Sequence, residues 1–352
     1  MKKTWIDASA AAADNKSGVE GYIERLSVAV QKIAPSEISV FMNFRGGADK
    51  RLEATRLPVP PKYYLDTLGV LSTVLAKNIH YPFSIIPKHS APAIITIYDL
   101  AYRRFPEVYD SKTLRILELS VAESINKSAH IITISESTKS DLINFYNVSK
   151  DKISVTYLAH DKLYEIKDDA KKTEGGYILA VGNVQPRKNL ISLLIAYNQI
   201  KDEISQNLIL VGNLQSSKEG QVIASYIEEN RLESRVKFTG YISDGELKNL
   251  YVSADVFIYP SLYEGFGIPI LEAMAAGTPV IACNNSSIAE VAGEAAHLCN
   301  NTEPNTLADG LMSLLGSIVL RDGLRRKGFE QVKNFSWEKT ARETVKIYEA
   351  LR

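Results

Sequence analysis

Cysteine is scarce in this chain, where Cys283 and Cys299 are the only two among 352 residues. Two cysteines are too few for a disulfide framework or a cysteine-based zinc site, and a reducing compartment fits this composition. The chain also lacks a stretch of about 18 apolar residues, the length that a membrane-spanning helix needs. Its first residues lack the apolar core of a signal peptide. We therefore expect a cytoplasmic protein, with weak peripheral contact at the inner face of the cell membrane left open.

No single charge sign dominates the sequence, because 41 lysines and arginines balance 41 aspartates and glutamates. A neutral chain has no strong electrostatic attraction to nucleic acid, so no nucleic-acid partner is expected. There is no Asp-x-Asp pair, no Gly-Lys-Ser/Thr segment of a P-loop, and no third glycine after Gly265 and Gly267. An NAD-dependent enzyme and an NTPase are therefore disfavoured, and we expect neither a metal ion nor a cofactor.

Apolar runs of strand length alternate with helical patterns along the chain, which predicts parallel α/β layers. A chain of 352 residues is long enough for two domains, each with its own core. The polar residues 166–176 are the best candidate for a linker between them.

Local signals predict several helix boundaries. Ser243 and Glu246 have the spacing of a capping box, and Ser135 stands where a helix cap is expected after a strand. Asn189 is expected to cap a helix that begins with Leu190. Residues 65–76 are apolar but short and interrupted, which indicates a buried helix.

The most informative segment is residues 259–279, which read YPSLYEGFGIPILEAMAAGTP. A strand is expected to end here, followed by a glycine loop and a short helix. Pro269 suits the first turn of that helix, and Gly277 suits the position just past its end. Glycine lets backbone come close to a ligand, and a helix N-terminus presents unpaired N–H groups. This segment therefore predicts a seat for phosphate or sugar oxygens.

Two carboxylates, Glu264 and Glu272, argue against a site for phosphate alone. Carboxylates repel phosphate but accept hydrogen bonds from hydroxyl groups, so the combination suits a nucleotide sugar. The alternative is that Glu264 is a solvated loop residue and Glu272 a carboxylate that complements the helix dipole. The residues by themselves leave both interpretations open.

Arg187 and Lys188 stand between a predicted strand and the start of a helix, in the segment VGNVQPRKNL at residues 181–190. Two adjacent cations in such a position can bind a diphosphate through charge-assisted hydrogen bonds. Taken alone, the pair also fits a solvated surface position.

Together, these motifs resemble those of retaining glycosyltransferases of the family-4 type, which have the two-domain GT-B fold. The resemblance extends to VKFTGY at 236–241, SSIAEVAG at 286–293 and FSWE at 335–338. It implies two Rossmann-like parallel-sheet domains that face a cleft. They would be an acceptor-side domain at 1–165 and a donor-binding domain at 177–335, with a helix at 336–352 that packs back on the first domain.

The resemblance also implies the chemistry. The enzyme would transfer a hexose from a nucleotide-diphosphate donor to a glycan or lipid-linked glycan with retention, without a metal ion, and GDP-mannose is the favoured donor. Catalytic roles fall to Glu264, Arg187, Lys188 and Asp99, with Arg187 and Lys188 on the diphosphate and Asp99 on the acceptor side. Donor-binding roles fall to Gly18, Tyr241, Phe266, Gly267, Ile268 and Glu272. The similarity is greatest to bacterial mannosyltransferases of polysaccharide assembly.

Two residues depart from the family pattern. Tyr98 stands where relatives commonly have a histidine, and Glu20 stands where they usually have a second glycine of the N-terminal loop. A tyrosine with a pKa near 10 is a poor proton acceptor at neutral pH. A catalytically silent donor-binding subunit is therefore one alternative. Another GT-B enzyme, such as a nucleotide-sugar epimerase or a glycan phosphorylase, is a second.

Overall fold

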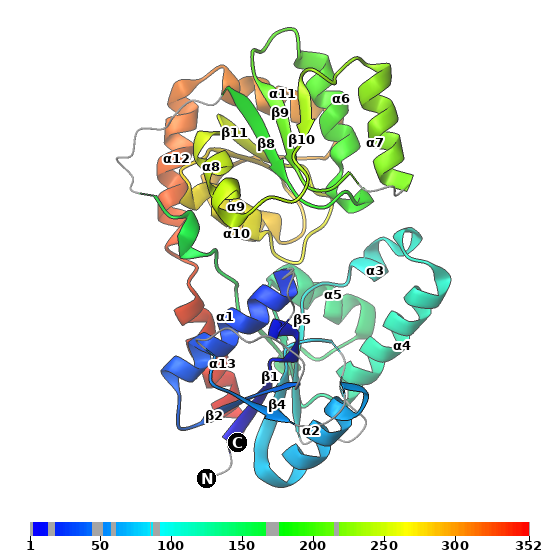
Figure 1. The fold of residues 1–352 in the computed structure, drawn as a ribbon, viewed down its shortest axis with the longest axis vertical. Helices are drawn as coiled ribbons and strands as arrows, with labels where there is room; N and C mark the ends of the chain where they lie inside the picture. Colours follow the sequence, from blue (N-terminus) through cyan, green and yellow to red (C-terminus); the bar gives the residue numbers. More distant parts are fainter. Residues whose placement is uncertain are drawn as a thin grey trace. The chain divides into compact units, whose positions relative to one another are not determined.

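A computed structural model of the chain describes residues 3–12, 18–43, 52–57, 61–84, 86, 92–166, 176–214 and 218–351. The chain divides into two compact units (Figure 1). The first comprises residues 1–158 with 335–352, and the second comprises residues 159–334. Of the predicted linker at 166–176, only Ile166 and Gly176 are among the described residues.

The described part of the first unit contains a seven-stranded parallel sheet in the order β3-β2-β1-β4-β5-β6-β7. Its strands are β1 (Lys3–Asp7), β2 (Ile38–Asn43), β3 (Ala54–Leu57), β4 (Ala76–Tyr81), β5 (Ala93–Ile97), β6 (His130–Thr133) and β7 (Ile153–Val155). The central strands are buried on both faces, as β5 and β6 show along their whole length. Such strands are the continuous apolar runs that the sequence displays.

Helices cover both faces of this sheet (Figure 1). They are α1 (Gly18–Ile33), α2 (Pro61–Leu75), α3 (Ala101–Arg104), α4 (Ser111–Lys127), α5 (Glu136–Tyr146) and, from the end of the chain, α13 (Trp337–Ala350). Side chains of α2, α4 and α5 share one core cluster with strand residues. α13 packs against α1. Tyr348 of α13 also bonds through its hydroxyl to Nδ1 of His80 on β4, at 2.6 Å.

The second unit repeats this design with six described parallel strands in the order β10-β9-β8-β11-β12-β13. They are β8 (Tyr177–Val181), β9 (Asn207–Val211), β10 (Val236–Phe238), β11 (Val256–Tyr259), β12 (Val280–Cys283) and β13 (Ala296–Cys299). Its helices are α6 (Leu190–Ile200), α7 (Lys218–Glu229), α8 (Asp244–Ser253), α9 (Ile268–Ala275), α10 (Ile288–Ala292), α11 (Pro304–Leu315) and α12 (Ile318–Val332). Two Rossmann-like parallel-sheet units confirm the predicted fold class.

The local predictions have mixed outcomes. The capping box of Ser243 and the cap of Ser135 are confirmed, since each side chain accepts a bond from the first turn of its helix. Asn189 is the N-cap residue of α6, as predicted, but its side chain makes no capping hydrogen bond. Its backbone is left-handed, and its side-chain amide donates instead to the carbonyls of Pro260 and Thr302. α2 is a helix, but not a buried one, because Val74 is 67% exposed.

Candidate active site

The glycine loop lies between β11 and α9, as the sequence predicts. Gly267 has φ of 113°, in the region that favours glycine, and a Cβ there would approach Cδ1 of Ile270 to 3.3 Å. Pro269 lies in the first turn of α9, and Gly277 follows the end of the helix with φ of 68°. These residues set where the loop ends and where the helix begins and stops.

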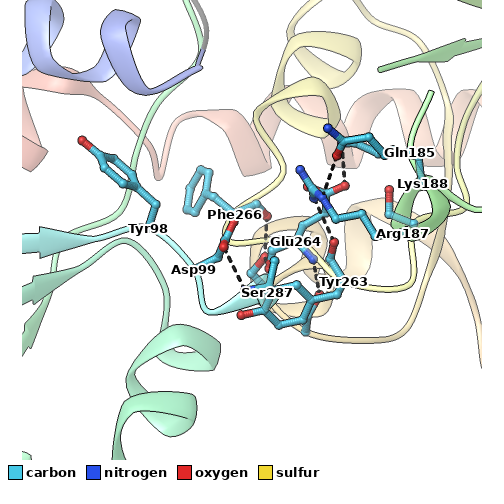
Figure 2. Close-up of polar contacts among 12 residues, drawn as sticks. Tyr98, Asp99, Gln185, Arg187, Lys188, Tyr263, Glu264, Phe266 and Ser287 are labelled. Atoms are coloured by element: carbon cyan, nitrogen blue, oxygen red, sulfur yellow. Dashed lines mark hydrogen bonds and ion pairs between the residues drawn. The ribbon is translucent and has the colours of Figure 1, made fainter. Parts of the chain in front are cut away.

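Glu264 of this loop receives two cations from the turn after β8 (Figure 2). Nη1 of Arg187 lies 2.8 Å from its Oε2, and Nζ of Lys188 lies 2.6 Å from its Oε1. Burial raises the pKa of the Glu264 carboxyl, but the two adjacent cations outweigh burial and hold that pKa below its ordinary value. The structure therefore joins three predicted site residues in one network, with the carboxylate ionised at neutral pH.

Neighbouring groups hold the two cations in place. Nζ of Lys188 donates to the hydroxyl of Tyr259 at 2.9 Å and lies 4.9 Å from the centre of that ring. Arg187 donates through Nε to Oε1 of Gln185 at 3.1 Å and through Nη1 to the carbonyl of Tyr263 at 3.2 Å. Burial raises the pKa of Tyr259 well above its ordinary value, so its hydroxyl stays neutral. The cluster of one carboxylate and two cations carries a formal charge of about +1.

A second loop, which follows β12, forms hydrogen bonds with the backbone of the glycine loop. The backbone N–H of Glu264 donates to Oγ of Ser286 at 3.0 Å. The hydroxyl of Ser287 shares its single proton between the carbonyls of Glu264 and Phe266, both 2.8 Å away (Figure 2). Sequence reasoning missed these serines as functional residues. The available signal was the polar run from Asn284 to Ser287 between a buried strand and a helix.

Two further residues predicted to bind the donor, Glu272 and Tyr241, make no described hydrogen bond to Glu264. Glu272, on α9, accepts a hydrogen bond at 3.1 Å from Tyr251, whose ring packs edge-on against Tyr164. Tyr241 follows β10 and is 83% exposed. Neither has a hydrogen bond with Glu264 among those between described residues, so their roles stay predictions.

Gly18, Asp99 and Tyr98 are the residues of the first unit to which the sequence draws attention. Gly18 is the first residue of α1, and its preceding loop lies outside the described residues. Asp99 follows β5 and accepts a hydrogen bond at 3.0 Å from the backbone N–H of Ala101. The hydroxyl of Tyr98 donates to the carbonyl of Pro82 at 2.5 Å, and its ring lies edge-on to Tyr22 with 5.3 Å between the centroids. The Tyr98 side chain is therefore fixed against its own sheet.

The described residues contain neither a cluster of metal ligands nor a membrane-spanning helix. Within the described ranges, no three residues of the types His, Cys, Asp and Glu are grouped in a way that suits a metal ion. No described helix is both long enough and apolar enough to cross a membrane.

Solved structures with the same architecture define the fold. Sucrose-phosphate synthase from Thermosynechococcus elongatus superposes with a TM-score of 0.77 at 20% identity, covering 100% of this chain and 99% of that one. The Anabaena protein HepE, solved in complex with UDP-glucose, superposes with a TM-score of 0.74 at 17% identity, covering 99% and 100%. Likeness at such identities shows the fold alone, which is the GT-B fold of glycosyltransferases.

Sequence relatives then give the family. Residues 161–331 match the family described as glycosyl transferases group 1. O-antigen chain mannosyltransferase B of Escherichia coli is 31% identical over 281 residues, which span 77% of this chain and 74% of that protein. The chain belongs to the group 1 glycosyltransferases, and the predicted family and enzyme class are confirmed.

Proposed function

We propose that this glycosyltransferase moves mannose from GDP-mannose to a glycan or lipid-linked glycan acceptor, with retention of configuration. The mannosyltransferase relative supports the choice of sugar, and the complex of HepE with UDP-glucose supports a nucleotide-sugar donor. The observation that carries the proposal is the pairing of Arg187 and Lys188 on the buried Glu264. It places two cations side by side at the edge of the sheet.

The two cations would stabilise the diphosphate leaving group. Glu264, Tyr259 and Gln185 already hold Arg187 and Lys188 before any ligand binds. Donors that are fixed in advance stabilise developing negative charge without a cost of reorganisation. The net charge of about +1 on this cluster then offsets part of the diphosphate charge, and we propose on this basis that transfer needs no metal ion.

The other predicted residues would complete donor binding. The amides of Phe266, Gly267 and Ile268, with the carboxylate of Glu264, would hold the sugar. Glu272 would accept hydrogen bonds from the ribose, and backbone near Tyr241 would contact the base. Gly18 would approach the donor phosphate, and Asp99 would serve the acceptor.

Retention requires the acceptor to attack the face of the sugar that the diphosphate leaves. The acceptor oxygen bonds to the anomeric carbon while the bond from that carbon to the phosphate oxygen breaks. The electron pair of the broken bond goes to the phosphate oxygen, which also takes the acceptor proton. Tyr98 does not suit the role of base, because burial, with Tyr22 and Glu20 nearby, raises its pKa well above the ordinary value. Its hydroxyl also donates to Pro82.

Contact with an anionic lipid surface is a separate part of the proposal. α4 exposes Lys112, Arg115, Ile116 and Leu119 at a spacing that places them on one helix face. Ile116 is 52% exposed and Leu119 is 62% exposed. Aliphatic groups flanked by cations fit a membrane interface with anionic headgroups. We expect the protein to co-sediment with vesicles that contain phosphatidylglycerol, and the double variant I116S/L119S to lose this binding. Equal vesicle binding by the variant and the wild type would contradict the lipid contact. Self-association of the protein without vesicle binding would contradict it as well.

The donor is tested with a panel of nucleotide sugars, by calorimetry for binding and NMR for hydrolysis, with EDTA present. We expect GDP-mannose to bind most tightly and to release α-mannose slowly. Preference for UDP-glucose would replace the donor but keep the mechanism. Dependence on added magnesium would contradict metal independence, and no binding of any donor would overturn the proposal.

A further inference from the structure

We propose that Ser287 is a positioning residue of this site, which aims the backbone amides of Gly265 and Gly267 at the sugar of the donor. The identity of the donor rests on the proposed function, whereas the aiming of the amides rests on hydrogen bonds within the second unit.

The direction of the two amides follows from peptide geometry. The hydroxyl oxygen of Ser287 lies 2.8 Å from the carbonyl oxygens of both Glu264 and Phe266, which share its single proton (Figure 2). In a trans peptide the carbonyl and the N–H of the next residue point in opposite directions. The described peptides are all trans. The N–H groups of Gly265 and Gly267 therefore both point away from Ser287.

These amides have no acceptor of their own. Gly265 and Gly267 are buried, and neither N–H donates to any group in the described part of the chain. Buried N–H groups without a partner are rare and costly in folded proteins. Two of them in the loop that carries Glu264, both directed away from Ser287, form a place for ligand oxygens.

Residues next to Ser287 also form hydrogen bonds with the segment that contains the glycine loop. Ser286 accepts from the N–H of Glu264 at 3.0 Å, and Asn285 donates to the carbonyl of Ser261 at 2.9 Å. Ser286 adopts φ of 42°, a left-handed conformation that is unfavourable for serine. Ser287 itself is fully buried. The segment thus contains a strained residue, Ser286, and a buried hydroxyl, that of Ser287, which bonds to the glycine loop. Both features are expected if this segment holds the glycine loop in one conformation.

The test compares GDP-mannose with GDP, because the sugar meets the amides and the nucleotide does not. We expect Ser287→Ala to weaken GDP-mannose binding about tenfold in calorimetry, as the freed carbonyls let the loop rotate. The affinity for GDP should change less than twofold. Ser287→Thr should restore most of the difference, since it keeps the hydroxyl. Ser287→Cys, with a weaker donor of similar size, should give an intermediate value and replaces Ser287→Ala if that variant does not fold.

Ser243→Ala is the matched control, because it removes another serine hydroxyl in the same unit, the cap of α8. It should lower the melting temperature and leave both affinities unchanged. Equal loss of GDP and GDP-mannose affinity in Ser287→Ala, or unchanged affinities, would overturn the inference and leave the proposed function intact. A wild-type protein that binds no nucleotide sugar would overturn the proposed function, and this inference with it.

Discussion

The two units each bury a carboxylate at the carboxyl edge of the sheet, and the two carboxylates are treated in opposite ways. Glu264 in the second unit faces Arg187 and Lys188, which lower its pKa. Asp7 ends β1 in the first unit and, among the described residues, receives only neutral donors, the backbone and hydroxyl of Ser9 and the hydroxyl of Tyr64. Burial raises the pKa of Asp7 to about 6.

The surroundings of Glu264 suit an anionic ligand, whereas those of Asp7 do not. In the second unit two cations form ion pairs with one carboxylate, and a diphosphate can bind the same cations. The first unit offers Asp7 no ion pair among the described residues, and these residues also leave its Oδ2 without a hydrogen-bond partner. Elsewhere in this unit the hydroxyl of Tyr98 donates to Pro82, and another buried carboxylate, Asp141, is paired with Arg104. We therefore expect the second unit to stabilise the leaving group.

The largest effect is expected from removing a cation of the second unit. Arg187→Ala should lower the rate of transfer by about 10²-fold, which corresponds to about 3 kcal/mol of leaving-group stabilisation. It also leaves Glu264 with one cation instead of two. The measurement is the initial rate of transfer at saturating donor.

Lys237→Ala is the control, since Lys237 is an exposed cation of β10 in the same unit. Its rate should equal that of the wild type. A folded Arg187→Ala protein with normal activity would show that Arg187 does not act on the diphosphate.

The next largest effect concerns Asp7 and appears in the pH dependence of stability. A buried carboxyl with a raised pKa holds its proton longer in the folded state than in the unfolded state. Stability therefore falls as pH rises from about 4 to about 6. Asp7→Asn cannot titrate. Its free energy of unfolding, relative to the wild type, should increase by about 2 kcal/mol between pH 4 and pH 7.

Chemical denaturation across this pH range measures the difference. Asp66→Asn, which changes an exposed aspartate on α2, should not show it. A parallel pH dependence of Asp7→Asn and wild type would mean that Asp7 carries no raised pKa. The comparison between the two buried carboxylates would then lose its basis.

Sequence patterns were sufficient for the fold class and for the residues that carry charge in the second unit. The loop from Glu264 to Gly267 and the caps of Ser135 and Ser243 are local features, so neighbouring residues reveal them. Arg187, Lys188 and Glu264 were proposed as one site through the family resemblance, and the structure shows that they meet. Their individual roles stay predictions.

Features that depend on distant partners were not predictable in this way. β4 carries Asn78 and His80, which are unusual in a central strand. They are accommodated because Tyr348, 268 residues after His80, bonds to the His80 ring, and its carbonyl accepts from Asn78. Burial lowers the pKa of His80 to about 3, so the ring stays neutral. Ser287 was missed for the same reason, since its carbonyl partners lie 21 and 23 residues earlier in the chain.

The smallest of the expected effects concerns Glu272, the second carboxylate of the second unit. Glu272 accepts one hydrogen bond from the neutral Tyr251 and lies half-buried on α9. If it binds the ribose hydroxyls, Glu272→Ala should weaken the binding of GDP about tenfold, since hydrogen bonds to charged groups contribute about 1.5 kcal/mol or more. The rate at saturating donor should change little, because the ribose does not change charge during transfer. Calorimetry with GDP, beside Tyr251→Phe as the variant that keeps the carboxylate, distinguishes this from a packing effect. Equal GDP affinity in Glu272→Ala and wild type would remove Glu272 from the donor site, and of the two carboxylates predicted to bind the donor only Glu264 would remain.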